Sequence, residues 1–122
     1  MLRFQISIVG GAAGAPLAAS FDSALAALEQ LPRMFIEPDG SFVWRGTTGD
    51  GQAWQVDGNL IDRGDVLAYV DASGHCPEEQ FNELLRALGW PGAPLAFELT
   101  RRGVMLDEQA FRKLARTPAG AV

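Results

Sequence analysis

The stretch from residue 34 to residue 70 constrains the fold most, because it consists of short strand-like segments joined by turns. One turn is the triplet PDG, in which proline fixes φ and glycine tolerates positive φ. The triplet DGN is typical of a tight hairpin turn, and RGD ends the strand that follows it. Short turns join antiparallel neighbours, so we expect an antiparallel sheet. Its strands are predicted at residues 34–37, 41–46, 52–56, 60–62 and 66–72.

Helical and strand-like patterns flank this central stretch. Residues 2–9 alternate as a strand, and so do residues 95–99. A first helix is predicted to bury Phe21, Ala24, Leu25 and Leu28 and to end at Pro32. Its N-cap is Ser20, unless Pro16 opens the helix a turn earlier. A short last helix over residues 106–116 is expected to be capped by Asp107 or by the turn before it. The second helix has the clearest pattern, with an apolar face of Phe81, Leu84, Leu85 and Leu88 and a stop at Gly89.

The order of these elements predicts a single α+β domain over residues 1–122. We expect a mostly antiparallel, twisted sheet of about six to seven strands, with two or three helices packed on one face. The arrangement resembles a split βαβ unit with an extra hairpin. A chain of 122 residues is long enough to bury a self-sufficient core.

Composition excludes several classes of function. The chain is acidic, with 15 acidic and 10 basic residues and a net charge of −5, and it has no basic stripe, so we expect no nucleic-acid partner. No apolar run reaches the length of a membrane span, so no membrane partner is expected either. The first twenty residues partly imitate a signal peptide, but their polar alternation favours a strand. With one cysteine, this predicts a cytoplasmic protein.

His75 and Cys76, the one histidine and the one cysteine, are adjacent before Pro77. With Pro77 at the first helical position, Cys76 would be the N-cap, where the helix dipole stabilises a thiolate. Against a reactive thiol, the C-x-x-C position is Glu79, and Glu78 and Glu79 place negative charge at the same helix start. We therefore predict a structural cysteine, and keep His75 and Cys76 as weak catalytic candidates.

Cofactor and metal patterns are incomplete. Asp57 and Asn59 match two positions of an EF-hand loop, but Asp62 stands where that loop requires glycine. The glycine-rich segment GGAAGAP lacks the lysine of a phosphate-binding loop and the spacing of a dinucleotide fingerprint. We expect a turn and a connector at these places, with no metal and no cofactor.

Three aromatic residues remain as weak ligand-binding candidates: Trp44, Trp54 and Tyr69. They could line a groove, although aromatic residues are more often part of a core. Residues 66–70 are apolar at successive positions, which predicts a central strand with an apolar surface on both sides. Helices can cover only one face, so we expect a homodimer through the sheet.

Two functional hypotheses follow. The first is a non-enzymatic module for protein interaction or homo-oligomeric assembly, acting through a sheet edge or the apolar strands. The alternative is small-ligand binding or a thiol-dependent activity centred on His75 and Cys76. The sequence favours a protein without enzymatic activity, without deciding the question.

Overall fold

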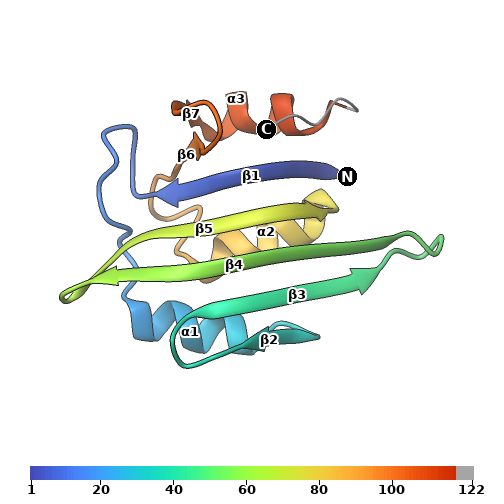
Figure 1. Cartoon of the computed structure of the whole chain (residues 1–122), viewed down its shortest axis with the longest axis horizontal. Helices are drawn as coiled ribbons and strands as arrows, with labels where there is room; N and C mark the ends of the chain where they lie inside the picture. The colour runs from blue at the N-terminus through green and yellow to red at the C-terminus, as the bar shows by residue number, and fades with distance from the viewer. Residues whose placement is uncertain (118–122) are drawn as a thin grey trace.

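The computed structural model describes residues 1–117, which form one sheet and three helices (Figure 1). The strands are β1 (Leu2–Val9), β2 (Met34–Ile36), β3 (Ser41–Thr47), β4 (Ala53–Arg63), β5 (Val66–Cys76), β6 (Ala96–Leu99) and β7 (Val104–Asp107). The helices are α1 (Phe21–Glu29), α2 (Glu78–Ala87) and α3 (Glu108–Ala115). None of the helices in this part of the chain is long and apolar enough to cross a membrane.

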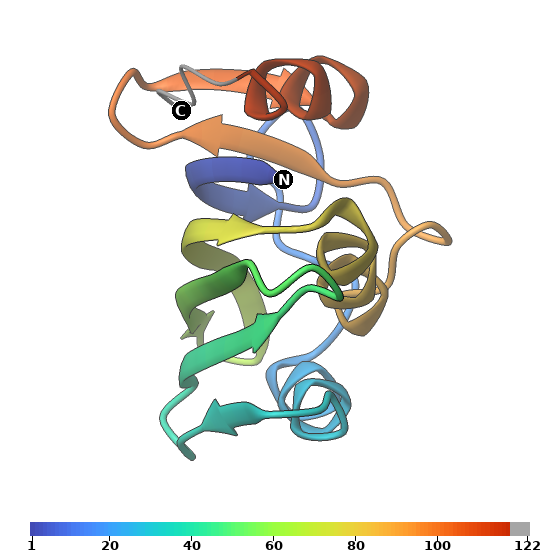
Figure 2. The ribbon, with the colours of Figure 1, turned by 90° about the vertical axis from the view of Figure 1, so that its right-hand side faces the viewer.

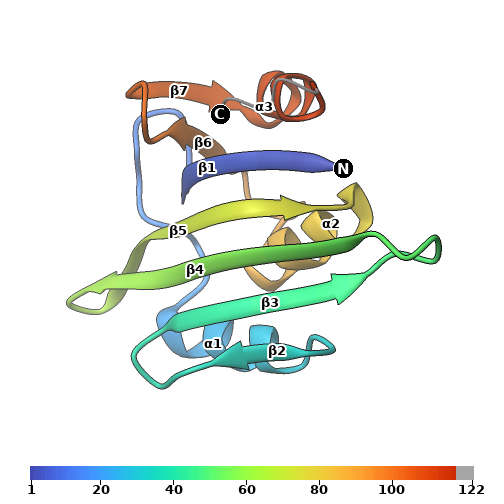
Figure 3. The same cartoon turned by 45° about the vertical axis from the view of Figure 1, so that its right-hand side comes forward.

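The sheet has the order β2-β3-β4-β5-β1-β6-β7, and all neighbouring strands are antiparallel (Figures 1 and 3). Strands β5 and β6 both pair antiparallel with β1, so they run parallel to each other on its two sides and are connected through α2. This is the predicted split βαβ unit, and β2, β3 and β4 extend it on one side. The α+β class and the antiparallel sheet are confirmed.

All three helices lie on one face of the sheet, as expected (Figure 2). The core fills the space between this face and the helices. Three residues of α2 and its C-cap residue were predicted to face the sheet, and none of the four has exposed surface: Phe81, Leu84, Leu85 and Leu88. The strands contribute alternate residues, such as Phe42 and Trp44 on β3 and Trp54 and Val56 on β4. Period-two alternation therefore divides each central strand into a buried and an uncovered side.

Of the three N-caps predicted from the sequence, two are confirmed and one was wrong. Ser20 accepts a hydrogen bond from the Ser23 amide and caps α1, and Asp107 accepts one from the Ala110 amide and caps α3. The N-cap of α2 is Pro77, without a side-chain hydrogen bond, so the prediction that Cys76 caps this helix was wrong. Cys76 is the last residue of β5, because its side chain fills the core instead of turning toward the helix amides.

A second correction concerns the DGN triplet, residues 57–59, which lies inside β4 and makes no turn. The reason is packing: a Cβ on Gly58 would lie 2.2 Å from the ring of Phe42, so the glycine makes room for that ring. The inward alternation of Trp54, Val56 and Leu60 continues through the triplet. The β4–β5 turn lies instead at residues 64 and 65, where Gly64 has a φ of 65°.

The uncovered face differs from the expected apolar surface. Strand β5 is central, but the large side chains of the apolar run that stay uncovered are only Val66 at its first position, which is 43% exposed, and Tyr69, which is half-buried. The prediction of an apolar face was wrong, because the other outward positions of the central strands are mostly polar: Ser41, Arg45, Gln55, Asp57, Asn59, Asp71 and Ser73. Strand β7 was also missed, since residues 104–107 are too few to show a pattern.

Candidate functional site

A row of polar side chains crosses four strands near one end of the uncovered face. In the strand register Arg45 of β3 is opposite Gln55 of β4, Gln55 is opposite His75 of β5, and His75 is opposite Arg3 of β1. Directly opposed residues lie on the same face, with Cβ atoms roughly 5 Å apart. The sheet thus gathers two arginines and the histidine from distant parts of the sequence.

A cavity of about 570 Å³ opens beside this row, at the end of the β3–β4 hairpin. Its larger lining side chains come from Arg33, Arg45, Thr47, Trp54, Gln55 and His75. Pockets for small molecules typically have volumes of about 300–1,000 Å³. The cavity therefore has the size of a small-ligand site, and its lining is basic.

Arg33 is held in place beside this cavity. Its φ of 61° lies in the left-handed region, which a non-glycine residue seldom adopts and which recurs at functional positions. Its Nε donates a hydrogen bond of 3.2 Å to the backbone oxygen of Arg45. A Cβ on Gly46 would lie 2.6 Å from the ring of Trp54 and 2.9 Å from a guanidinium nitrogen of Arg33. Glycine at position 46 thus lets the guanidinium lie close to the β3 backbone.

The charges around this cavity are not neutralised within the described part of the chain. Among residues 1–117, the only basic residues that form ion pairs are Arg112 and Arg116, and both lie far from the cavity in the fold. No aspartate or glutamate is among the described residues that line it. In a chain of net charge −5, Arg33 and Arg45 therefore form a local cationic site at this cavity.

A second cavity, of about 470 Å³, lies further along the same face and is acidic and polar. Its lining includes Asp57, Asn59, Asp71 and Ser73. Ser7 donates a hydrogen bond of 2.8 Å to Asp71, and Gln55 donates one of 3.0 Å to Asp57. Within residues 1–117 no group of three or more His, Cys, Asp or Glu side chains is close enough to hold a metal ion. Asp57 and Asn59 face outward from a strand and lie outside any turn.

His75 and Cys76, the catalytic candidates, point to opposite faces of β5. Cys76 is fully buried in the core, whereas His75 is half-buried and lines the basic cavity. The structure therefore does not bring the thiol and the imidazole together as a nucleophile and its base. Burial raises the pKa of the Cys76 thiol from 9.0 to about 12, so the thiol stays protonated at neutral pH.

Cys76 should accordingly react with thiol reagents only when the protein unfolds. We expect the rate of modification by a disulfide reagent at pH 8 to follow the fraction unfolded in urea. Because the folded pKa is raised above the unfolded one, the stability linked to this proton is intact below about pH 9 and decreases as the pH rises toward about 12. Rapid, stoichiometric modification of the native protein would contradict this prediction.

The three aromatic candidates are also divided between the two faces. Trp44 and Trp54 are 1% and 4% exposed and contact each other edge to face in the core, with ring centres 5.0 Å apart. Tyr69 lies on the uncovered side of β5, where the guanidinium of Arg63 approaches its ring. The three do not form one groove. Trp54 instead adjoins the basic cavity together with His75.

Sequence reasoning missed Arg3, Arg33 and Arg45. Each is an ordinary arginine at a polar position of a strand or beside one. Their convergence depends on the register between four strands, and a single sequence carries no signal for it.

Comparison with protein families, with curated proteins and with solved structures finds no match for this chain.

Proposed function

We propose that this domain is a non-enzymatic assembly module that forms a homodimer through the free edge of β2. The observation that carries the proposal is the position of Phe35, which is 67% exposed and lies on the outermost strand of the sheet. Its cross-strand neighbour Val43 is 36% exposed on the same face. The most exposed large apolar side chain of the described residues thus lies where the sheet can accept another strand.

The backbone of β2 supports an added strand. The Glu37 amide donates to the Ser41 carbonyl at 2.9 Å, so Glu37 and Phe35 direct their backbone groups toward β3. The carbonyl groups of Met34 and Ile36 and the amide of Ile36 therefore point to the outer edge, where no strand lies beyond β2 (Figure 1). These are the groups that pair in strand addition.

A second copy of the chain suits this edge better than an unrelated strand does. In an antiparallel pair of two β2 strands centred on Phe35, the two Phe35 rings meet, and Met34 lies opposite Ile36 of the second copy. Met34 and Ile36 already pack against the core, so this pairing would extend the core across the dimer. The same register opposes Arg33 to Glu37, so no like charges meet.

The proposed contact is short, since β2 has three residues. It buries less than the roughly 1,200–2,000 Å² of a standard stable interface. The dimer is therefore weak and concentration-dependent. We propose a cytoplasmic location, because the one cysteine is not in a disulfide. We propose no nucleic-acid partner, because the basic site is small.

Light scattering coupled to gel filtration tests the proposal over a range of concentrations. We expect the mass to rise from 13.1 kDa toward twice that value as the concentration increases. Phe35→Lys should stay monomeric, because a charged side chain would face its own copy at the centre of the contact. Circular dichroism of the same samples would verify that the variant is folded.

Val104→Lys is the matched control, since Val104 is 43% exposed on β7 at the opposite edge of the sheet. This variant should dimerise like the original protein. A mass that stays near 13.1 kDa at every concentration, or equal dimerisation of the two lysine variants, would refute the proposal.

A further inference from the structure

We infer that the basic cavity beside β3 binds a small ligand through a phosphate group. Arg33 lies at the end of the proposed β2–β2 contact, whereas the other residues of this site lie outside it, and binding here does not require the dimer. Arg33 and Arg45 border the cavity from the sheet edge and from the uncovered face, and His75 borders it from the central strand.

The number of positive charges favours phosphate over a single carboxylate. Two guanidinium groups adjoin the cavity, and the imidazole of His75 adds a ring N–H as a further hydrogen-bond donor. Arg3 on β1, opposite His75 in the register, is the next cation along this row and lies outside the cavity lining. A phosphate monoester carries about −1.5 to −2 at neutral pH, which balances such a cluster, whereas a carboxylate carries one negative charge.

The remaining donors also suit a phosphate group. The Arg33 Nε is used by the Arg45 carbonyl, so this guanidinium has a fixed place and retains its terminal N–H groups for a ligand. Thr47 adds a hydroxyl at the same cavity, and Gln55 adds the amide N–H that its hydrogen bond to Asp57 leaves over. A volume of about 570 Å³ leaves room for an organic group attached to the phosphate.

The test is a titration of the isotopically labelled protein, followed by NMR, with inorganic phosphate, pyrophosphate and glycerol phosphate as separate probes. We expect saturable shifts of the backbone amides of residues 45–47, 55 and 75. Stronger binding of glycerol phosphate would indicate an ester as the natural ligand, and equal or stronger binding of inorganic phosphate would indicate the free ion. Sodium chloride at matched ionic strength separates binding from screening.

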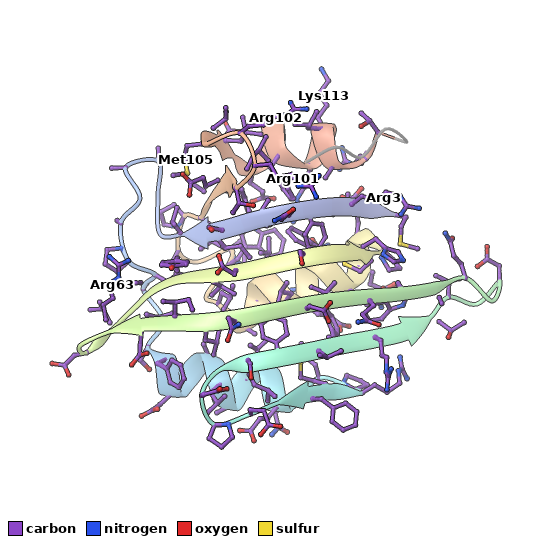
Figure 4. The ribbon with its side chains drawn as sticks, viewed as in Figure 1. Arg3, Arg63, Arg101, Arg102, Met105 and Lys113 are labelled. Carbon is purple, nitrogen blue, oxygen red and sulfur yellow. The ribbon has the colours of Figure 1, made fainter. Side chains whose placement is uncertain are left out.

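Arg45→Ala and His75→Gln are the test variants. The first should weaken phosphate binding roughly tenfold, the usual effect of losing one charge-assisted hydrogen bond. It keeps the backbone carbonyl that holds Arg33, so the cavity persists. Arg63→Ala is the matched control and should bind phosphate normally, because Arg63 lies at the far end of the sheet from Arg3 (Figure 4).

Two results would overturn the inference: shifts that sodium chloride reproduces, or equal affinities of Arg45→Ala and Arg63→Ala. Folding of each variant is verified by its amide spectrum. Repeating the titration on Phe35→Lys shows whether the phosphate site is independent of dimerisation, so that failure of one proposal is distinguishable from failure of the other.

Discussion

Trp44→Ala is expected to lower the free energy of unfolding by about 3–5 kcal/mol, the range for truncating a buried aromatic side chain. Trp44 is 1% exposed and packs edge to face against Trp54. Its indole Nε1 donates a hydrogen bond of 3.0 Å to the Pro32 carbonyl, which fixes the chain just before β2. The substitution leaves a large cavity and an unpaired carbonyl, and urea denaturation measures the loss.

Val43→Ala is the control for this substitution, because Val43 is the neighbouring residue on the opposite face of β3. It should cost less than about 1 kcal/mol. The loss in the free energy of unfolding for Trp44→Phe should lie between those two values, since phenylalanine keeps much of the ring but loses the hydrogen bond. Equal costs for Trp44→Ala and Val43→Ala would mean that Trp44 is outside the core, and would favour its alternative role as a ligand-binding residue.

The parts of the fold that the sequence predicts best are those governed by local periodicity. The apolar residues of α2 recur at helical spacing, and all four of them are buried. The caps Ser20 and Asp107 were predictable because an N-cap needs only a side-chain oxygen near the first amides of its own helix. Central β5 followed from its apolar run.

The sequence predictions fail at residues whose type is required by tertiary packing and not by the local backbone. Gly58 resembles a turn glycine in sequence, but it is small because the Phe42 ring occupies the space of its side chain. Cys76 resembles an N-cap, yet it ends a strand and fills the core. The basic site could not be predicted for the same reason, since Arg45, His75 and Arg3 become neighbours only through the register of four strands. Of the proposed site residues, only His75 and Trp54 were foreseeable candidates.

The second large effect is expected for Arg112→Met, at the contact between α2 and α3. Arg112 is 8% exposed, and its guanidinium lies 5.4 Å from the ring centres of both Phe81 and Trp90. It pairs with Glu108 at 2.9 Å and with Glu78 at 3.3 Å. Removing Arg112 leaves the Glu108 carboxylate without its cation, while Glu78 keeps its pair with Arg116, so we expect a loss of about 2–4 kcal/mol in urea denaturation. This expected loss is smaller than the cost of breaking a fully buried ion pair, because the side chains of both glutamates are about one-third exposed.

Adding Glu108→Gln to Arg112→Met should recover part of this loss, because the double variant no longer leaves the Glu108 carboxylate without its cation. The pH dependence gives an independent check. Hydrogen bonding from Arg116, with the charges of Arg116 and Arg112, lowers the pKa of Glu78. Because the pKa of Glu78 is lower in the folded than in the unfolded protein, its ionised carboxylate stabilises the fold above pH 4.5, the pKa in the unfolded chain. This contribution is lost as the pH falls through the pKa of the folded protein. The free energy of unfolding of Arg112→Met should therefore decrease less on acidification than that of the original protein. If the effects of Arg112→Met and Glu108→Gln on this free energy are additive, and its dependence on pH is unchanged, Arg112 stabilises the protein through packing alone.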